Sequence, residues 1–194
     1  VGASASRDNA WGNRTIKRYR QMGWGDALVA VHPSGDIPGA ITFRTLGDIP
    51  GGVDYAEISV AADQAPAVLA AAKGKVKTAV ITSAGFSEAG EAGRALEREL
   101  LAAARAGGVR FVGPNCMGVF SPAGRQTFQL DVPTTPGTVS IVSQSGGLAG
   151  DIIKSGAARG IEFSKLVTVG NSVDVAPGEL CEWLAEDPDT ELLG

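Results

Sequence analysis

Histidine and cysteine are scarce in this sequence of 194 residues, which holds one histidine, His32, and two cysteines, Cys116 and Cys181. Because it has neither a histidine cluster nor a CxxC pair, the sequence predicts no metal site. The wide separation of the two cysteines disfavours a disulfide framework and favours a reducing compartment, here the cytoplasm. A Ser-His-Asp triad would depend on His32, which we interpret as an ordinary residue at the end of an apolar strand.

Positive charge and long apolar runs are also lacking. The 17 lysines and arginines are outnumbered by 21 aspartates and glutamates, and the net charge of −4 disfavours nucleic acid as a partner. Any phosphate that the protein binds must therefore be held by a local site. The longest apolar run, residues 65–72, contains Pro66 and is too short to span a bilayer, so no membrane segment is predicted.

Strand and helix patterns instead alternate along the chain, which is typical of βαβ units and a parallel sheet. In the first part of the sequence, apolar runs predict strands at residues 27–31, 55–61, 77–85 and 109–113. Helices are predicted at 64–74 and 88–108. The apolar stripe of the second helix comprises Leu96, Leu100, Ala103 and Ala104, and the helix ends at a Gly107-Gly108 cap.

The same alternation restarts after a stretch rich in proline and glycine, residues 114–137. Further strands are predicted at 138–144 and 163–170, and further helices at 146–160 and 176–187. We therefore predict an α/β fold with a first domain at 1–125, a linker at 126–137 and the start of a second doubly wound domain at 138–194.

Both ends of the sequence are expected to interrupt a strand. Val1 and Gly2 are interpreted as the end of a strand entering its turn, and residues 190–194 as the opening of another. The second unit is also too short to close an ordinary doubly wound sheet. We expect the sequence to be a segment of a longer polypeptide.

The turns after the predicted strands are the expected ligand sites, because open parallel sheets bind ligands at the carboxyl ends of their strands. A dinucleotide site would need GxGxxG in the first turn and an acidic residue after the second strand. The first turn instead places Gly2 and Gly12 far apart, and the second strand ends at His32-Pro33, so an NAD-dependent oxidoreductase is the weakest alternative. The basic helix after the first turn forms either a solvated face or a phosphate contact; its cations are Arg14, Lys17, Arg18 and Arg20.

The stretch "IVSQSGGLAGDII", residues 141–153, passes from a strand to a helix through its smallest residues. Glycines at such a junction allow a tight turn. They also let an anion approach the free N–H groups and the positive dipole end of the helix. Residues alone leave both interpretations open.

Ordered motifs over nearly the whole chain resemble the NDP-forming acyl-CoA synthetases, a group that includes ADP-forming acetyl-CoA synthetase and, more distantly, the succinyl-CoA synthetase alpha chain. The motifs are "GAS…GN", "SVAAD", "ITSAGFSEAG", "GPNCMGV", "VSQSGGL" and "TVGNSVDV…AEDPDT". The resemblance implies a Rossmann-like CoA-binding domain followed by part of a flavodoxin-like, doubly wound ligase domain.

Carried over by motif, the resemblance implies a set of coenzyme A (CoA) contacts at the strand ends. They are Gly2, Ala3, Ser4, Arg7, Gly12, Asn13, Pro33, Val60, Ala61, Ala62, Thr82, Ser83, Ala84, Gly85, Asn115 and Cys116. It further implies that Ser145, Gly146 and Gly147 hold phosphate. We interpret Cys116 as a packed small residue of its turn rather than a nucleophile, since an activating base or cation is not evident.

The sequence departs from the family in two ways, and the first is that relatives carry a lysine near the CoA phosphates where this chain has Ser34-Gly35. Arg7 or Arg14 would have to substitute for that lysine. The family's phosphohistidine is expected beyond Gly194, and His32 matches a different turn, so no catalytic residue is predicted in this chain. ATP or ADP with Mg²⁺ would bind outside this segment, to an ATP-grasp domain or subunit, and an oligomer is expected.

The predicted function is thus the CoA-binding and partial ligase segment of an enzyme that converts acid, CoA and nucleoside triphosphate into acyl-CoA, nucleoside diphosphate and phosphate. Its small-molecule partners would be CoA and a carboxylic acid or acyl phosphate. An alternative is a CoA- or acyl-CoA-sensing module fused to a protein acetyltransferase. The acyl group and the choice of ADP or GDP stay open.

Overall fold

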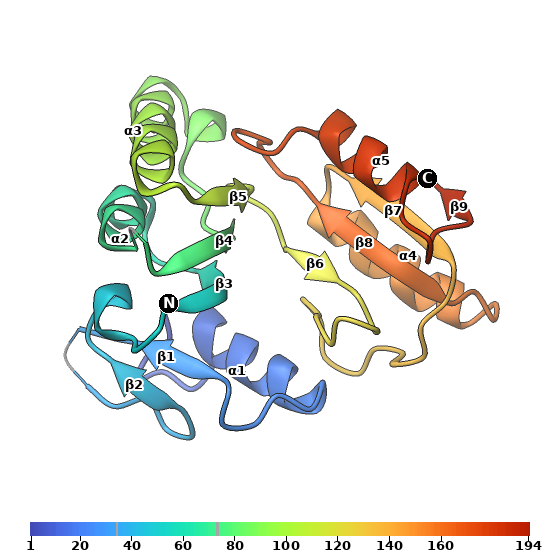
Figure 1. Ribbon diagram of the computed structural model, residues 1–194, viewed down its shortest axis with the longest axis horizontal. Helices are drawn as coiled ribbons and strands as arrows, with labels where there is room; N and C mark the ends of the chain where they lie inside the picture. Colours follow the sequence, from blue (N-terminus) through green and yellow to red (C-terminus); the bar gives the residue numbers. More distant parts are fainter. Residues whose placement is uncertain (34, 73) are drawn as a thin grey trace.

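Strands and helices alternate along the chain and form two β-sheet units with helices packed against them (Figure 1). The computed structural model describes residues 1–33, 35–72 and 74–194. The strands are β1 (Val29–Val31), β2 (Ile41–Phe43), β3 (Val53–Ile58), β4 (Val76–Ile81), β5 (Arg110–Val112), β6 (Val119–Phe120), β7 (Val139–Ser143), β8 (Phe163–Thr168) and β9 (Leu192–Leu193). The helices are α1 (Trp11–Gln21), α2 (Ala65–Ala71), α3 (Glu91–Gly107), α4 (Gly146–Ala157) and α5 (Pro177–Ala185).

The first unit contains β1 paired in parallel with β2, and β4 paired in parallel with both β3 and β5. Its strand pairs therefore follow the order β2-β1 and β3-β4-β5. In a doubly wound sheet, the groups β2-β1 and β3-β4-β5 have one further parallel strand between them, next to both β1 and β3. The predicted α/β class, with a Rossmann-like unit and a second doubly wound unit, is confirmed.

An apolar cavity of about 530 Å³ occupies that place between β1 and β3. Ile16 and Leu28 are among the side chains that line it. Val1 lies at one end, where its amino group donates to the Glu57 carbonyl at 2.7 Å and its own carbonyl accepts from the Ser59 N–H at 3.0 Å. This is the hydrogen-bond pattern of a parallel neighbour of β3.

The core of the first unit forms where α2 and α3 cover the β3-β4-β5 sheet. Ile58, Ile81 and Phe111 come from the strands, and Leu69 and Leu100 come from the helices. Full burial of one such side chain contributes about 1.5–3 kcal/mol to folding.

The predicted stripe of α3 faces this core. Leu100 and Ala104 are buried, while Leu96 and Ala103 pack partly buried at its margin. The helix begins at Glu91, three residues later than predicted, and ends at Gly107 with the predicted glycine cap, since Gly108 takes a left-handed conformation with φ of 68°. A residue without a Cβ adopts that conformation without strain.

The second unit is a sheet with the order β6-β8-β7-β9, in which only β6 runs antiparallel to its neighbour. Phe120, Phe128, Ile153 and Leu166 form its core. Val119 and Phe120, which the sequence analysis includes in the first domain, therefore pair and pack with the second sheet. A strand of two residues is too short to show an alternating pattern in the sequence.

Predicted strands at 55–61 and 77–85 end earlier in the structure, at Ile58 and Ile81. The β-branched pattern of the sequence continues past the last hydrogen bond of each strand pair. The strands end earlier because the residues that follow are small and turn the chain away from the sheet. The predicted helix at 64–74 ends at Ala71, and its residue Lys73 lies outside the described residues.

The segment after β8 is hydrogen-bonded to the segment after β5, and these bonds contribute to joining the units. The N–H groups of Asn171 and Val173 donate to the carbonyls of Pro114 and Gly113 at 2.9 and 3.1 Å.

Within the described ranges, no helix has the length and apolarity to cross a membrane. The same part of the chain holds no group of three or more acidic, histidine or cysteine side chains placed to bind a metal ion.

Candidate functional site

A cleft of about 510 Å³ lies where the carboxyl ends of β3, β4 and β5 meet the start of α4 from the second unit. Its lining residues are Trp11, Ser59, Val60, Thr82, Ser83, Ala84, Asn115, Cys116, Met117, Gly146 and Gly147. The predicted contacts Val60, Thr82, Ser83, Ala84, Asn115 and Cys116 thus share one cleft with the predicted phosphate residues Gly146 and Gly147. The structure brings together two groups that lie far apart in sequence.

The predicted phosphate turn, residues 145–147, is built by the end of β7 and the start of α4. Ser145 caps the helix, since its Oγ accepts from the Leu148 N–H at 3.3 Å. In the described part of the chain, the N–H groups of Gly146 and Gly147 have no hydrogen-bond partner, as expected for a first helical turn. They are directed donors at the positive end of the helix dipole, an arrangement that suits an anion.

The two glycines of this turn differ in their surroundings. A Cβ on Gly146 would collide with the side chain of Met117, so the tight packing requires glycine at that position. A Cβ on Gly147 would meet only Ser145 Oγ, at 3.9 Å. The turn therefore serves packing through Gly146 and leaves open space at Gly147.

Hydroxyl and amide groups line the middle of the cleft. The Ser59 and Thr82 hydroxyls are 2.7 Å apart, and Ser83 Oγ donates to the Val60 carbonyl. Asn115 takes a left-handed conformation with φ of 57°, and its N–H donates to the Ser83 carbonyl at 2.9 Å. These contacts tie three strand ends together and present polar atoms to an amide-rich ligand.

Cys116 is buried, with a relative exposure of 5%. Burial, followed by the nearby charge of Glu57, raises the pKa of its thiol to about 12. The sulfur lies 3.5 Å from the Ile81 carbonyl oxygen, to which the thiol donates. A thiol that stays protonated at neutral pH is a poor nucleophile, which supports the interpretation of Cys116 as a packing residue.

The first turn, residues 2–13, holds its own shape. The Ser4 N–H donates to Asn13 Oδ1 at 2.6 Å, and Asn13 Nδ2 donates back to the Ser4 carbonyl at 2.8 Å. A Cβ at Gly12 would collide with the backbone of Ala3. More than half of the predicted contacts lie outside the cleft lining: Gly2, Ala3, Ser4, Arg7, Gly12, Asn13, Pro33, Ala61, Ala62, Gly85 and Ser145.

Pro33 and Gly85 are two of these outlying residues, and they lie in the turns after β1 and β4. Pro33 is exposed after β1, and the neighbouring Ser34, the place of the family's lysine, lies outside the described residues. Gly85 packs on Ala62 and donates its N–H to Glu88 Oε1 at 2.6 Å. His32 also follows β1 and is not among the residues that line the cleft.

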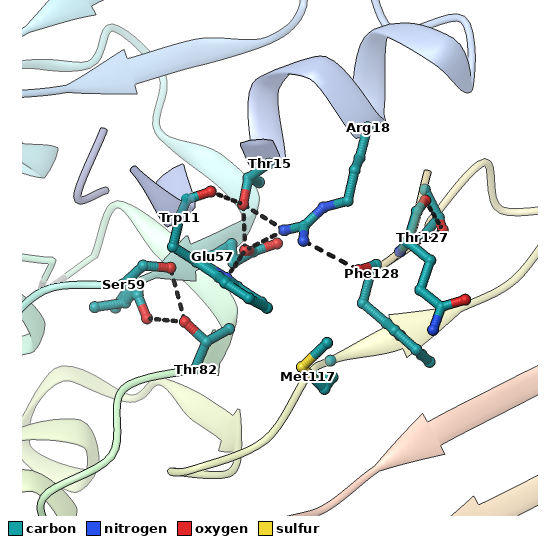
Figure 2. Close-up of polar contacts among 12 residues, drawn as sticks. Trp11, Thr15, Arg18, Glu57, Ser59, Thr82, Met117, Thr127 and Phe128 are labelled. Atoms are coloured by element: carbon teal, nitrogen blue, oxygen red, sulfur yellow. Dashed lines mark hydrogen bonds and ion pairs between the residues drawn. The ribbon is translucent and has the colours of Figure 1, made fainter. Parts of the chain in front are cut away.

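The basic side chains of α1 differ in exposure, since one is buried and others face solvent. Arg18 is 2% exposed and forms an ion pair with Glu57, N–O distance 3.0 Å, whose side chain is 7% exposed. Arg18 also donates to the Phe128 carbonyl at 3.0 Å, a contact that joins the two units (Figure 2). Arg18 is therefore not available to a ligand, whereas Arg14 and Lys17 are exposed.

Trp11 and Met117 are cleft residues that the sequence analysis missed. Trp11 donates its Nε1–H to Glu57 Oε1 at 3.2 Å, and Figure 2 shows this bond together with the Arg18 ion pair. A tryptophan directly before Gly12 in a predicted ligand turn is the sequence signal that could have indicated it.

Two family models match the chain. One, described as a CoA binding domain, covers residues 1–122, and the other, described as a succinyl-CoA ligase like flavodoxin domain, covers residues 136–194. The chain therefore combines a CoA-binding domain with part of a succinyl-CoA ligase like flavodoxin domain.

Similar proteins point the same way. An ADP-forming acetate–CoA ligase I of Archaeoglobus fulgidus is 35% identical, over all of this chain and 28% of its own length. A trans-feruloyl-CoA synthase of an unknown prokaryotic organism is 33% identical, again over the whole chain and 28% of the relative.

Among solved structures, the apo form of a dinucleotide forming acetyl-coenzyme A synthetase 1 of Candidatus Korarchaeum cryptofilum matches with a TM-score of 0.88 and 30% identity. The match covers all of this chain and 42% of that one. The chain belongs to the NDP-forming acyl-CoA synthetase family, as the motifs predicted. It spans well under half the length of these relatives.

Proposed function

We propose that this chain supplies the CoA-binding and phosphate-binding part of an NDP-forming acyl-CoA synthetase. Such an enzyme converts a carboxylic acid, CoA and a nucleoside triphosphate into acyl-CoA, nucleoside diphosphate and phosphate, by way of an acyl phosphate and a phosphohistidine. The observation that carries the proposal is the single cleft lined by Thr82, Asn115 and Gly147, which belong to the CoA and phosphate motifs.

The residues of the cleft fit CoA and phosphate chemistry. Asn115 and the hydroxyl pair Ser59 and Thr82 offer donors and acceptors to the amides of a pantetheine arm. The free N–H groups of Gly146 and Gly147 hold and orient a phosphoryl oxygen, and the helix dipole stabilises its negative charge. The chain's own part in the reaction is to bind, orient and stabilise charge.

The remaining parts of the proposal lie outside this segment. We propose that the phosphohistidine, the nucleotide and Mg²⁺ are held by further sequence, including an ATP-grasp domain or subunit, in a cytoplasmic oligomer. The first domain would comprise the CoA-binding unit with β1 to β5. The second would begin near β6, since Phe120 packs with Leu166.

The acid itself is not fixed by the relatives, because one is named for acetate and another for ferulate. The proposed reaction class, by contrast, has a direct test. The complete enzyme, given CoA, ATP or GTP and a series of acids, is expected to form acyl-CoA with release of nucleoside diphosphate and phosphate.

Release of AMP and pyrophosphate would assign a different reaction class. Thioester binding without turnover, together with transfer of acetyl groups to protein lysines, would instead identify the sensing module of an acetyltransferase.

A further inference from the structure

Trp11 has the largest side chain of the cleft lining, and the proposed function gives it no role. It is the first residue of α1 and lies half-buried. The other apolar side chains of the lining are small or flexible: Val60, Ala84 and Met117. The rigid indole therefore sets the free width of the cleft more than any other side chain there.

A network of contacts holds the indole in one orientation (Figure 2). Its Nε1–H donates to Glu57 Oε1 at 3.2 Å, and the same oxygen accepts from Thr15 at 2.5 Å and from Arg18 at 3.0 Å. The Arg18 and Arg14 guanidinium carbons lie 5.0 and 5.4 Å from the ring centre, within cation–π range. Turning the ring would break these contacts around a buried ion pair.

The phosphate turn and Met117 lie across the cleft from α1. Met117 packs against Gly146, and both line the same space as Trp11. In an acyl phosphate, the acyl carbon is joined to the phosphoryl group through one oxygen. An acyl phosphate whose phosphoryl group lies at Gly146 and Gly147 therefore has its acyl carbon close to this turn, and the cleft space that Trp11 and Met117 border is available to its acyl chain.

We propose that Trp11 is a specificity-determining residue that limits the length of the acyl group, with Glu57 as its positioning residue. The inference rests on the proposed function, since it takes the phosphoryl position from it. A fixed aromatic wall discriminates by shape, and one methylene that does not fit an apolar site changes specificity by about 10–200-fold.

The test measures kcat/KM of the complete enzyme for acetate, butyrate and hexanoate. Trp11→Ala is expected to raise the hexanoate-to-acetate ratio by about 10–200-fold, and Trp11→Phe, which keeps a smaller ring, by less. The ratio is measured on one preparation, so a loss of folded protein cancels. Trp183→Ala is the matched control, because Trp183 is 56% exposed on α5 and should leave the ratio unchanged.

A second readout is the dissociation constants of CoA, acetyl-CoA and hexanoyl-CoA. In Trp11→Ala, binding of hexanoyl-CoA should strengthen relative to the binding of both acetyl-CoA and CoA. An enzyme that forms no thioester from any acid would refute the proposed function, and the binding ratio would still test Trp11. An unchanged ratio, or equal weakening of CoA and both thioesters, would overturn the inference.

Discussion

Gly147→Asp is predicted to stabilise the fold while it impairs the handling of phosphate. Gly147 has an ordinary helical backbone position and open space around its Cα, since a Cβ at this position would have only Ser145 Oγ within 4 Å. Replacing glycine in a helix by aspartate contributes only about 0.3 kcal/mol through intrinsic propensity, because aspartate ranks just above glycine. A carboxylate in the first turn adds about 0.3–1 kcal/mol through the helix dipole.

The same carboxylate would occupy the place where the free N–H groups of Gly146 and Gly147 are proposed to meet a phosphoryl oxygen. Loss of one such electrostatic contact costs about 2.7–4 kcal/mol in the transition state, roughly a hundred- to a thousandfold in rate. The assay compares histidine phosphorylation of the complete enzyme with its thermal midpoint.

The matched control is Gly147→Ala, which adds a methyl group and no charge. It should share the gain in stability and lose less than about tenfold in rate, because the electrostatic contact persists. An aspartate variant that phosphorylates its histidine at the wild-type rate would show that the junction is a tight turn alone.

Three further predictions concern other parts of the structure. Arg18→Met leaves Glu57 buried without its cation and should cost about 3–5 kcal/mol of unfolding free energy, measured in urea. Arg18→Met combined with Glu57→Gln should recover much of this loss, and an Arg18→Met variant as stable as wild type would refute the buried pair. Because burial raises the pKa of Cys116 to about 12, this thiol should react with iodoacetamide at pH 8 far more slowly than the less buried Cys181. Peptide mass spectrometry would measure the two rates, and equal rates would contradict the burial of Cys116. An apolar, β-branched extension of about five residues before Val1 should fill the cavity between β1 and β3 and raise the unfolding free energy by more than about 3 kcal/mol. A Gly/Ser extension of equal length should not raise it. If both extensions change the unfolding free energy equally, the cavity is not a site for a strand.

The alternation of strands and helices was predictable because β4, β8 and α3 carry long, regular apolar patterns. The proximity of Thr82 to Asn115 followed from parallel topology, since the carboxyl ends of neighbouring strands share one edge. That Gly147 joins them was predictable only through the resemblance to a family. The ligand contacts of these residues stay a prediction.

Other features had no signal in the sequence. The three residues of β2 lie among prolines and glycines, and β6 has only two residues, so neither shows a period. The Arg18–Glu57 pair joins α1 to β3 across the sheet, and a charge run in a sequence does not show which of its members is buried. The orientation of Trp11 in the cleft depends on Glu57 of the same pair, to which its Nε1–H donates.

Titration of the chain with CoA tests the central claim most directly, with NAD as the comparison ligand. The claim is that small-residue turns at the strand ends, without a dinucleotide fingerprint, form a CoA site. CoA is expected to raise the unfolding free energy by about 2.7 kcal/mol at a hundredfold excess over its dissociation constant, and NAD is expected to have no effect. Stabilisation by NAD, with no response to CoA, would contradict the account.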